Sequence, residues 1–64
     1  MQNAHELYVG DIIIQGRVVG VVCRVSASHY EVFYVCEGHE PFKASTPKEM
    51  FGNAFFFHTR IIRS

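Results

Sequence analysis

The chain has 64 residues, of which 48% are hydrophobic, and its six basic and six acidic residues give a formal net charge of zero. This composition excludes a disordered chain and gives no broad electrostatic attraction for nucleic acid or an anionic membrane. The length limits the chain to one domain burying only ~60% of its unfolded surface, so we expect part of its apolar surplus to be covered by something else.

The N-terminal residues, MQNAHELY, lack the basic and apolar segments of a signal peptide. The polar residues 1–6 predict a loose N-terminal arm, and residues 7–64 a single domain. The longest apolar run, 18–23, is too short to span a bilayer. We therefore expect a cytoplasmic protein with no membrane partner.

The rest of the chain consists of short β-rich segments separated by turn residues. We predict strands over 7–14, 17–25, 30–36, 42–45 and 54–62. Between the last two, TPKEM (46–50) has the cap, the proline and the glutamate of a helical turn. Five strands with one short helical turn before the last predict an all-β fold, a five-stranded SH3-like barrel. The alternative, an OB-like barrel, normally needs more residues.

The two central strands form the best hairpin when the turn is centred on Ala27-Ser28. Arg24 then lies opposite Glu31, which is a favourable cross-strand pair. Both faces of the hairpin are apolar in this register, and only one can line a small barrel. We expect Gly20 at a bend where a side chain would clash. The inner face is predicted to contain Val19, Val21, Cys23, Val25, Tyr30, Val32 and Tyr34, and the outer face Val18, Val22, Phe33 and Val35.

The run Phe55-Phe56-Phe57 is the strongest indication of function. In a strand, Phe55 and Phe57 point to one face and Phe56 to the other. Phe55 and Phe57 would then fill the barrel while a loop covers Phe56; alternatively, Phe56 would belong to an exposed outward patch. Composition favours an outward patch that docks another chain. The predicted partner-binding residues are Val22, Phe33, Phe56 and Ile62.

The segment GRVVGVVCRVSASHYEVFYV, residues 16–35, resembles the central hairpin of the plasmid-encoded type II dihydrofolate reductases. The residues that fit the pattern are Gly16, Val18, Val19, Gly20, Cys23, Tyr30 and Val32. The resemblance extends weakly over residues 10–50 and implies an SH3-like barrel. The Val-Gln-Ile-Tyr segment that forms the family's active surface is replaced here by EPFKAS, so the resemblance implies the fold and no catalytic residue. A weaker resemblance to Tudor and KOW modules rests on Gly10-Asp11 and the Gly-x-Val at 16–18.

Metal and catalytic sites are poorly supported by the sequence. Cys36 and His39 have the spacing of a metal knuckle, but zinc needs two further ligands, and Cys23, His29 and His58 show no paired spacing. Cys23 and Cys36 are expected to be reduced and unpaired. The chain has no catalytic triad order, paired carboxylates or phosphate-binding loop. We expect no metal, no cofactor and no enzymatic activity.

The sequence therefore predicts a small non-catalytic protein-binding module that self-associates or docks to a partner protein. Its size also fits an accessory protein of a phage or mobile element. The alternative is a nucleic-acid-binding module that uses a basic surface with neighbouring aromatic residues, and a divergent type II reductase is a distant third. The candidate nucleic-acid-binding residues are Arg17, Lys43, Arg60 and Arg63.

Overall fold

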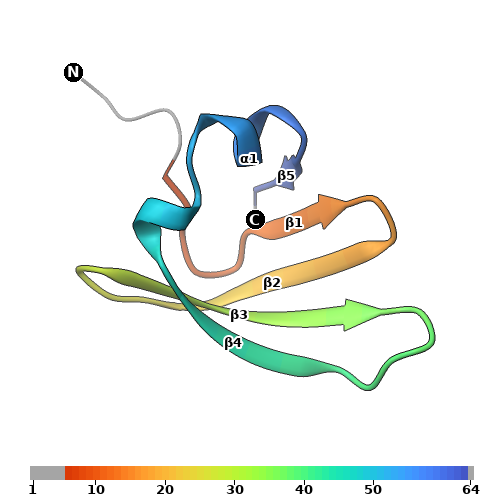
Figure 1. Ribbon diagram of the computed structural model, residues 1–64. Coiled ribbons are helices and arrows are strands. Elements are labelled where there is room, and N and C mark those ends of the chain that lie inside the picture. The colour runs from red at the N-terminus through yellow and green to blue at the C-terminus, as the bar shows by residue number, and fades with distance from the viewer. Residues whose placement is uncertain (1–5, 64) are drawn as a thin grey trace.

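The computed structural model describes residues 6–63 and contains one five-stranded antiparallel sheet (Figure 1). The strands follow the order β4-β3-β2-β1-β5 across the sheet. Their bounds are β1 Ile12–Gln15, β2 Val18–Val25, β3 His29–Cys36, β4 Phe42–Pro47 and β5 Arg60–Ile62. A short 3₁₀ turn, η1 (Lys48–Met50), and a short helix, α1 (Asn53–Phe57), come between β4 and β5. The prediction of an all-β fold is confirmed.

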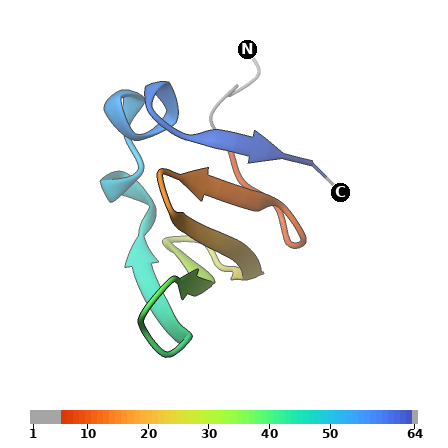
Figure 2. The ribbon, with the colours of Figure 1, turned by 90° about the vertical axis from the view of Figure 1, so that its right-hand side faces the viewer.

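The segment between β4 and β5 connects the two edge strands of the sheet. Figure 2 shows the sheet curling, with η1 and α1 beside the two strands that they connect. Within residues 6–63 the ladders join β4 only to β3, and β5 only to β1. Closure into a barrel therefore stays a prediction, whereas the five antiparallel strands and their order are observed.

A bulge divides the central hairpin into two registers. Near the turn, Arg24 pairs with Glu31 as predicted. Beyond the bulge, Val22 and not Cys23 lies opposite Val32, so Cys23 is an extra residue on β2. Because a one-residue shift moves every following side chain to the other face, the predicted faces are wrong from this point to the start of β2.

The core lies on the inner face of the sheet, beneath η1 and α1. Its buried residues are Leu7, Ile13, Val22, Tyr30, Val32 and Phe51. Each fully buried side chain of this size stabilises the fold by ~1.5–3 kcal/mol. Tyr30 connects three segments: its hydroxyl accepts a hydrogen bond from the Leu7 N–H at 3.2 Å, and its ring meets Phe51 edge to face at 5.2 Å and lies under the Lys48 ammonium.

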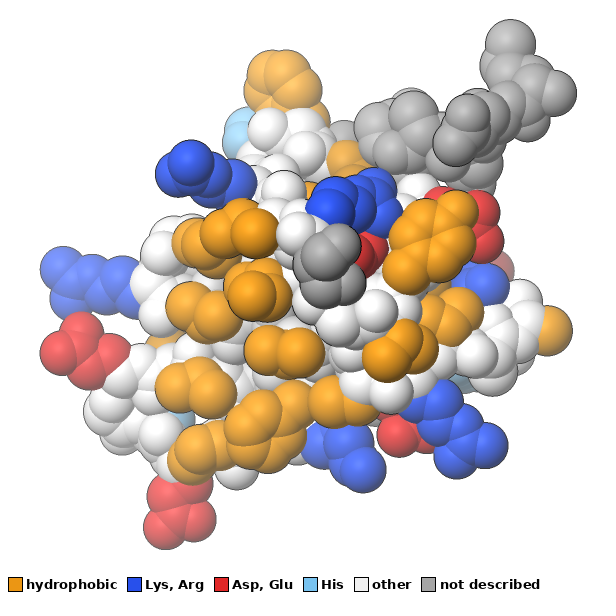
Figure 3. All heavy atoms as spheres, turned by 180° about the vertical axis from the view of Figure 1, so that it is seen from behind, with side chains coloured by type: hydrophobic (Ala, Val, Ile, Leu, Met, Phe, Trp, Pro, Cys, Tyr) orange, Lys and Arg blue, Asp and Glu red, His pale blue; other side chains and the backbone are white. Residues whose placement is uncertain are grey.

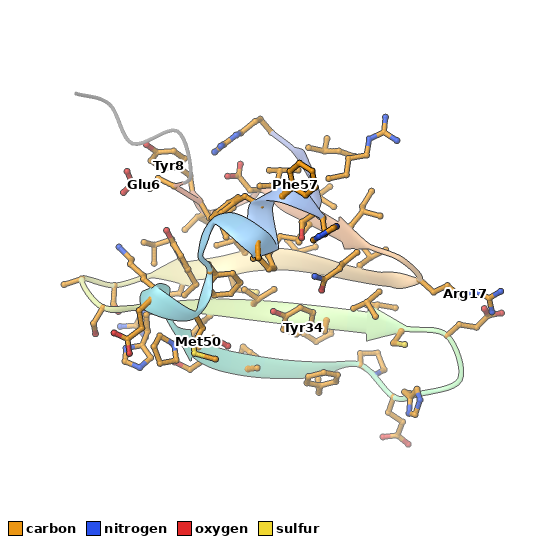
Figure 4. The ribbon with its side chains drawn as sticks, turned by 45° about the horizontal axis from the view of Figure 1, so that its top comes forward. Glu6, Tyr8, Arg17, Tyr34, Met50 and Phe57 are labelled. Carbon is orange, nitrogen blue, oxygen red and sulfur yellow. The ribbon has the colours of Figure 1, made fainter. Side chains whose placement is uncertain are left out.

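The predicted last strand, 54–62, is wrong in its first half because the aromatic run forms α1. Phe51 precedes the helix, whose N-cap is Gly52, and its buried ring meets Phe55 of α1 edge to face with ring centroids 4.6 Å apart. Phe56 also packs against the core. Phe57, predicted to fill the barrel, is 84% exposed and projects from α1 in Figure 4.

The ends of two other predicted strands differ from the structure by more than one residue. The first strand begins at Ile12 because residues 8–11 form a turn in which the Tyr8 N–H donates to the Asp11 carboxylate at 2.8 Å. The fourth strand continues to Pro47, which directly precedes the 3₁₀ turn. The predicted arm falls outside the described residues except for Glu6.

Candidate binding surface on the outer face of the sheet

The side of the sheet opposite the core is covered by apolar side chains. Strand registers place Ile62, Ile12, Val21 and Phe33 in one row across four strands. Figure 3 shows hydrophobic side chains gathered in a band across this side of the molecule. A second row contains Arg60, Ile14, Val19 and Val35. We call the apolar part of both rows the outer face: Ile12, Ile14, Val19, Val21, Phe33, Val35 and Ile62.

The outer face is accessible to a partner. Phe33 is 40% exposed and Val35 45%, and Val19, Val21 and Ile62 are exposed to a similar degree. These side chains are cross-strand neighbours, so their exposed areas adjoin one another. The outer face therefore presents a continuous apolar surface rather than separate protruding residues.

Charged side chains border the outer face on β2, β3 and β4. Lys43 is the β4 partner of Phe33 and ends the first row. Glu31 lies between two cations, with its carboxylate 3.8 Å from the Lys43 ammonium and 3.9 Å from the Arg24 guanidinium. Arg24 and Lys43 are largely exposed, so each pair contributes little to stability. Their effect is to give the apolar surface a polar rim.

The structure separates the four residues that were predicted to bind a partner. Phe33 and Ile62 lie on the outer face. Val22 was predicted to point outward, but it is only 1% exposed, because the bulge at Cys23 turns it into the core. Phe56 was also predicted to point outward, but it lies on α1 and packs against the core. Neither Val22 nor Phe56 belongs to the outer face.

The sequence reasoning missed most of the outer face. The predicted register places Val19 and Val21 in the interior, whereas both are exposed. The alternation of Ile12 and Ile14 around the buried Ile13 is a usable signal, since it marks two faces of β1. No comparable signal indicates the bulge that exposes Val19 and Val21, because β2 is apolar on both faces there.

The four candidate nucleic-acid-binding residues lie in different places. Lys43 and Arg60 are on the two strands that end the sheet order, and Arg17 is in the β1–β2 turn (Figure 4). The Arg63 guanidinium is engaged inside the chain, where it donates to the Asp11 carboxylate at 2.7 Å. The structure therefore does not gather these residues into one basic cluster.

A smaller aromatic group lies on the inner side of the sheet. The rings of Tyr34 and Phe42 are cross-strand neighbours with centroids 5.4 Å apart. Figure 4 shows Tyr34 over the middle of the sheet. Gly20 lies beneath the ring, where a β-carbon would be 3.0 Å from Cε1 of Tyr34. Partial burial raises the pKa of Tyr34 above its usual value of 10.0, because burial disfavours the charged phenolate.

The described residues contain no group of three or more side chains that could hold a metal ion. Both cysteines are free thiols; Cys23 is exposed and Cys36 is half-buried. No described helix is long and apolar enough to cross a membrane.

Comparisons with known proteins give no relative: no family model, curated protein or solved structure matches the chain. The resemblance to the type II dihydrofolate reductases therefore rests on the hairpin residues alone.

Proposed function

We propose that this protein is a small protein-binding module and that the outer face is its binding surface. The observation that carries the proposal is the continuity of that face, whose apolar side chains follow one another across β3, β2, β1 and β5. Large exposed apolar patches with polar rims are typical of protein–protein interfaces. The ion pairs around Glu31 supply such a rim.

Phe33 is the expected energetic centre of the interface. It is the one aromatic side chain of the outer face, and it lies between Val21 on β2 and Lys43 on β4. Burying an exposed Phe in an interface contributes up to ~1.5–3 kcal/mol from apolar area, and interface energy concentrates in a few such anchors. The surrounding aliphatic residues would mainly exclude water.

We also propose that the architecture is SH3-like. Support comes from the strand order, with β5 beside β1, and from the 3₁₀ turn ahead of the last strand. In such an arrangement the long β2 contributes to both halves of the fold. The outer face then crosses the middle of the curved sheet.

Phe33→Ser tests the proposed function, and Phe57→Ser is its matched control. Both replace an exposed phenylalanine, but Phe57 lies on α1, away from the outer face. We expect Phe33→Ser to weaken association by tenfold or more, or ~1.4 kcal/mol, while Phe57→Ser has no effect. Self-association is measured by sedimentation, and binding of other proteins by affinity capture from the native host.

Circular dichroism must show that both variants are folded. Loss of Phe33-dependent association in a folded variant supports the proposal. If Phe33→Ser and Phe57→Ser associate as the parent chain does, or if the parent associates with nothing, the outer face is not a binding surface.

A further inference from the structure

The charged residues at one end of the strands are divided between the two halves of the sheet. β2 is the middle strand of the order β4-β3-β2-β1-β5. Val18 at the start of β2 pairs with Cys36 at the end of β3, so the β1–β2 turn and the β3–β4 loop lie at the same end (Figure 1). The start of β5 is also at this end, since Arg60 pairs with Ile14.

At this end the basic residues lie on one side of β2 and the acidic residues on the other. Arg60 is on β5 and Arg17 is in the β1–β2 turn, whereas Glu37 and Glu40 are in the β3–β4 loop. All four are exposed. Within residues 6–63 none of them forms an ion pair; the pairs there involve Glu31 and Asp11. These four charges are therefore available to a molecule that covers the outer face.

We propose that a second copy of this chain covers the outer face, related to the first by a two-fold axis that runs parallel to β2. This inference rests on the proposed function and names the partner. A two-fold axis in the plane of the interface packs the same surface of both copies together. With the axis along β2, β1 of each copy lies over β3 of the other, and β5 lies over β4.

This arrangement matches apolar residues with apolar residues. Val19 and Val21 on β2 meet the same residues of the second copy. Because β1 lies over β3, Ile12 of one copy faces Phe33 of the other. Ile14 similarly faces Val35, since these residues occupy the second cross-strand row. The apolar rows of the two sheets thus cover each other.

The same arrangement brings opposite charges together. Arg60 of one copy lies over the β4 side of the other, where Glu40 precedes the strand, and symmetry repeats this contact. Arg17 and Glu37 are related in the same way, nearer to the axis. A two-fold axis perpendicular to the strands would instead place these charges over the opposite strand end. The division of charge therefore favours the axis along β2.

The size and charge of the chain also fit self-association. A stable interface buries about 800 Å² per partner, which is about a sixth of the chain's 4775 Å² of accessible surface. The outer face supplies an apolar centre, and the rim residues supply the remainder. The formal net charge is zero, so two copies have no overall repulsion to overcome.

Charge reversal tests the arrangement through sedimentation of purified proteins. We expect the parent chain to dimerise as its concentration rises. Arg60→Glu places two acidic groups at each symmetric contact, and Glu40→Arg places two basic groups there, so each variant should dimerise about tenfold more weakly. Mixed in equal amounts, the two variants form a heterodimer with an opposite-charge pair at both contacts. The mixture should recover the dimer affinity of the parent to within about threefold.

Glu49→Arg provides the control for net charge. Glu49 is exposed on η1, which lies beside the β2–β3 turn because Lys48 N–H donates to the Ser28 carbonyl. It is thus at the other end of the strands from Glu40. A mixture of Arg60→Glu and Glu49→Arg has the same net charges as the first mixture but should not recover the affinity. If Arg60→Glu fails to fold, the weakening by Glu40→Arg in the β3–β4 loop tests the same contact.

The outcomes separate this inference from the proposed function. If the parent chain stays monomeric but captures another protein in a Phe33-dependent way, the inference of a second copy is wrong, whereas the outer face remains the binding surface. A monomer without Phe33-dependent binding overturns both. If Phe33→Ser prevents dimerisation but the charge-reversal variants dimerise like the parent, the two-fold axis along β2 is wrong. The axis is also wrong if mixing Arg60→Glu with Glu40→Arg does not restore the dimer affinity.

Discussion

The guanidinium of Arg63 lies 2.7 Å from the carboxylate of Asp11, which is almost fully buried. Arg63 also donates to the Glu6 carbonyl at 3.0 Å, and Asp11 accepts the Tyr8 N–H. These contacts attach the segment before β1 to the segment after β5. Arg63→Ala leaves a buried carboxylate with one partner fewer, so we expect the free energy of unfolding to fall by about 1–3 kcal/mol. Urea denaturation at low protein concentration measures the loss.

Arg24→Ala is the control for this variant. Arg24 pairs with Glu31 at 3.9 Å, and its side chain is largely exposed, so its loss should change stability by less than about 0.5 kcal/mol. Equal effects of the two substitutions would show that the contact between Arg63 and Asp11 has no special structural role.

Alanine substitutions at Gly20 and Gly52 should change stability by different amounts. A β-carbon on Gly20 would lie 2.8 Å from Cγ1 of Val32 and 3.0 Å from Cε1 of Tyr34, whereas Gly52 has nothing within 4 Å. Gly20→Ala should therefore destabilise the fold by about 1–3 kcal/mol through overpacking. Gly52→Ala should stay within about 0.5 kcal/mol of the parent. A Gly20→Ala variant as stable as the parent would show that Val32 and the ring of Tyr34 move aside without cost.

Alanine substitutions at Val22 and Val21 test whether the bulge is present. Val22 is in the core and Val21 is on the outer face, so Val22→Ala should cost about 1.5–3 kcal/mol of stability and Val21→Ala less than about 0.5 kcal/mol. Denaturation is measured at concentrations where the chain is monomeric. The opposite order of effects would mean that β2 and β3 pair without a bulge.

Tyr34 predicts a loss of stability at alkaline pH. Its pKa is raised in the folded protein because burial disfavours the phenolate. The neutral form is thus favoured by folding, so this contribution is fully present below pH 10 and is lost as pH rises from 10 through the raised pKa. The urea midpoint should fall less between pH 9 and 11 in Tyr34→Phe than in the parent. Parallel pH dependences in the two proteins would contradict this assignment.

The strand pairing of the hairpin can be predicted from the sequence only where polar residues distinguish one face from the other. The turn-proximal register of the hairpin was predicted correctly because Arg24 and Glu31 identify one pairing. Farther along β2, valines occupy both faces, so no residue type indicates where the bulge lies. Phe33 and Ile62 were predicted to be exposed and are, but the intervening valines were assigned to the wrong side.

The aromatic run shows a second limit of sequence reasoning. Three consecutive phenylalanines favour a strand by propensity, and the strand predicted over 54–62 rests on this preference. In the structure the run is helical, and Phe55 and Phe56 pack against the core, where the ring of Phe55 meets that of Phe51 edge to face. Packing of these rings against a core built from distant parts of the chain outweighs the local preference and has no local signature.

The side chain of Cys23 can be replaced, but the strand pairing requires a residue at this position. Its side chain is exposed, so most polar residues could stand there without disturbing the core. Deleting the residue would be different in kind, because the hairpin would then have to give up either the pairing of Arg24 with Glu31 or the burial of Val22 against Val32. The residue works as a spacer, and this hairpin should tolerate almost any substitution at position 23 but no change of length.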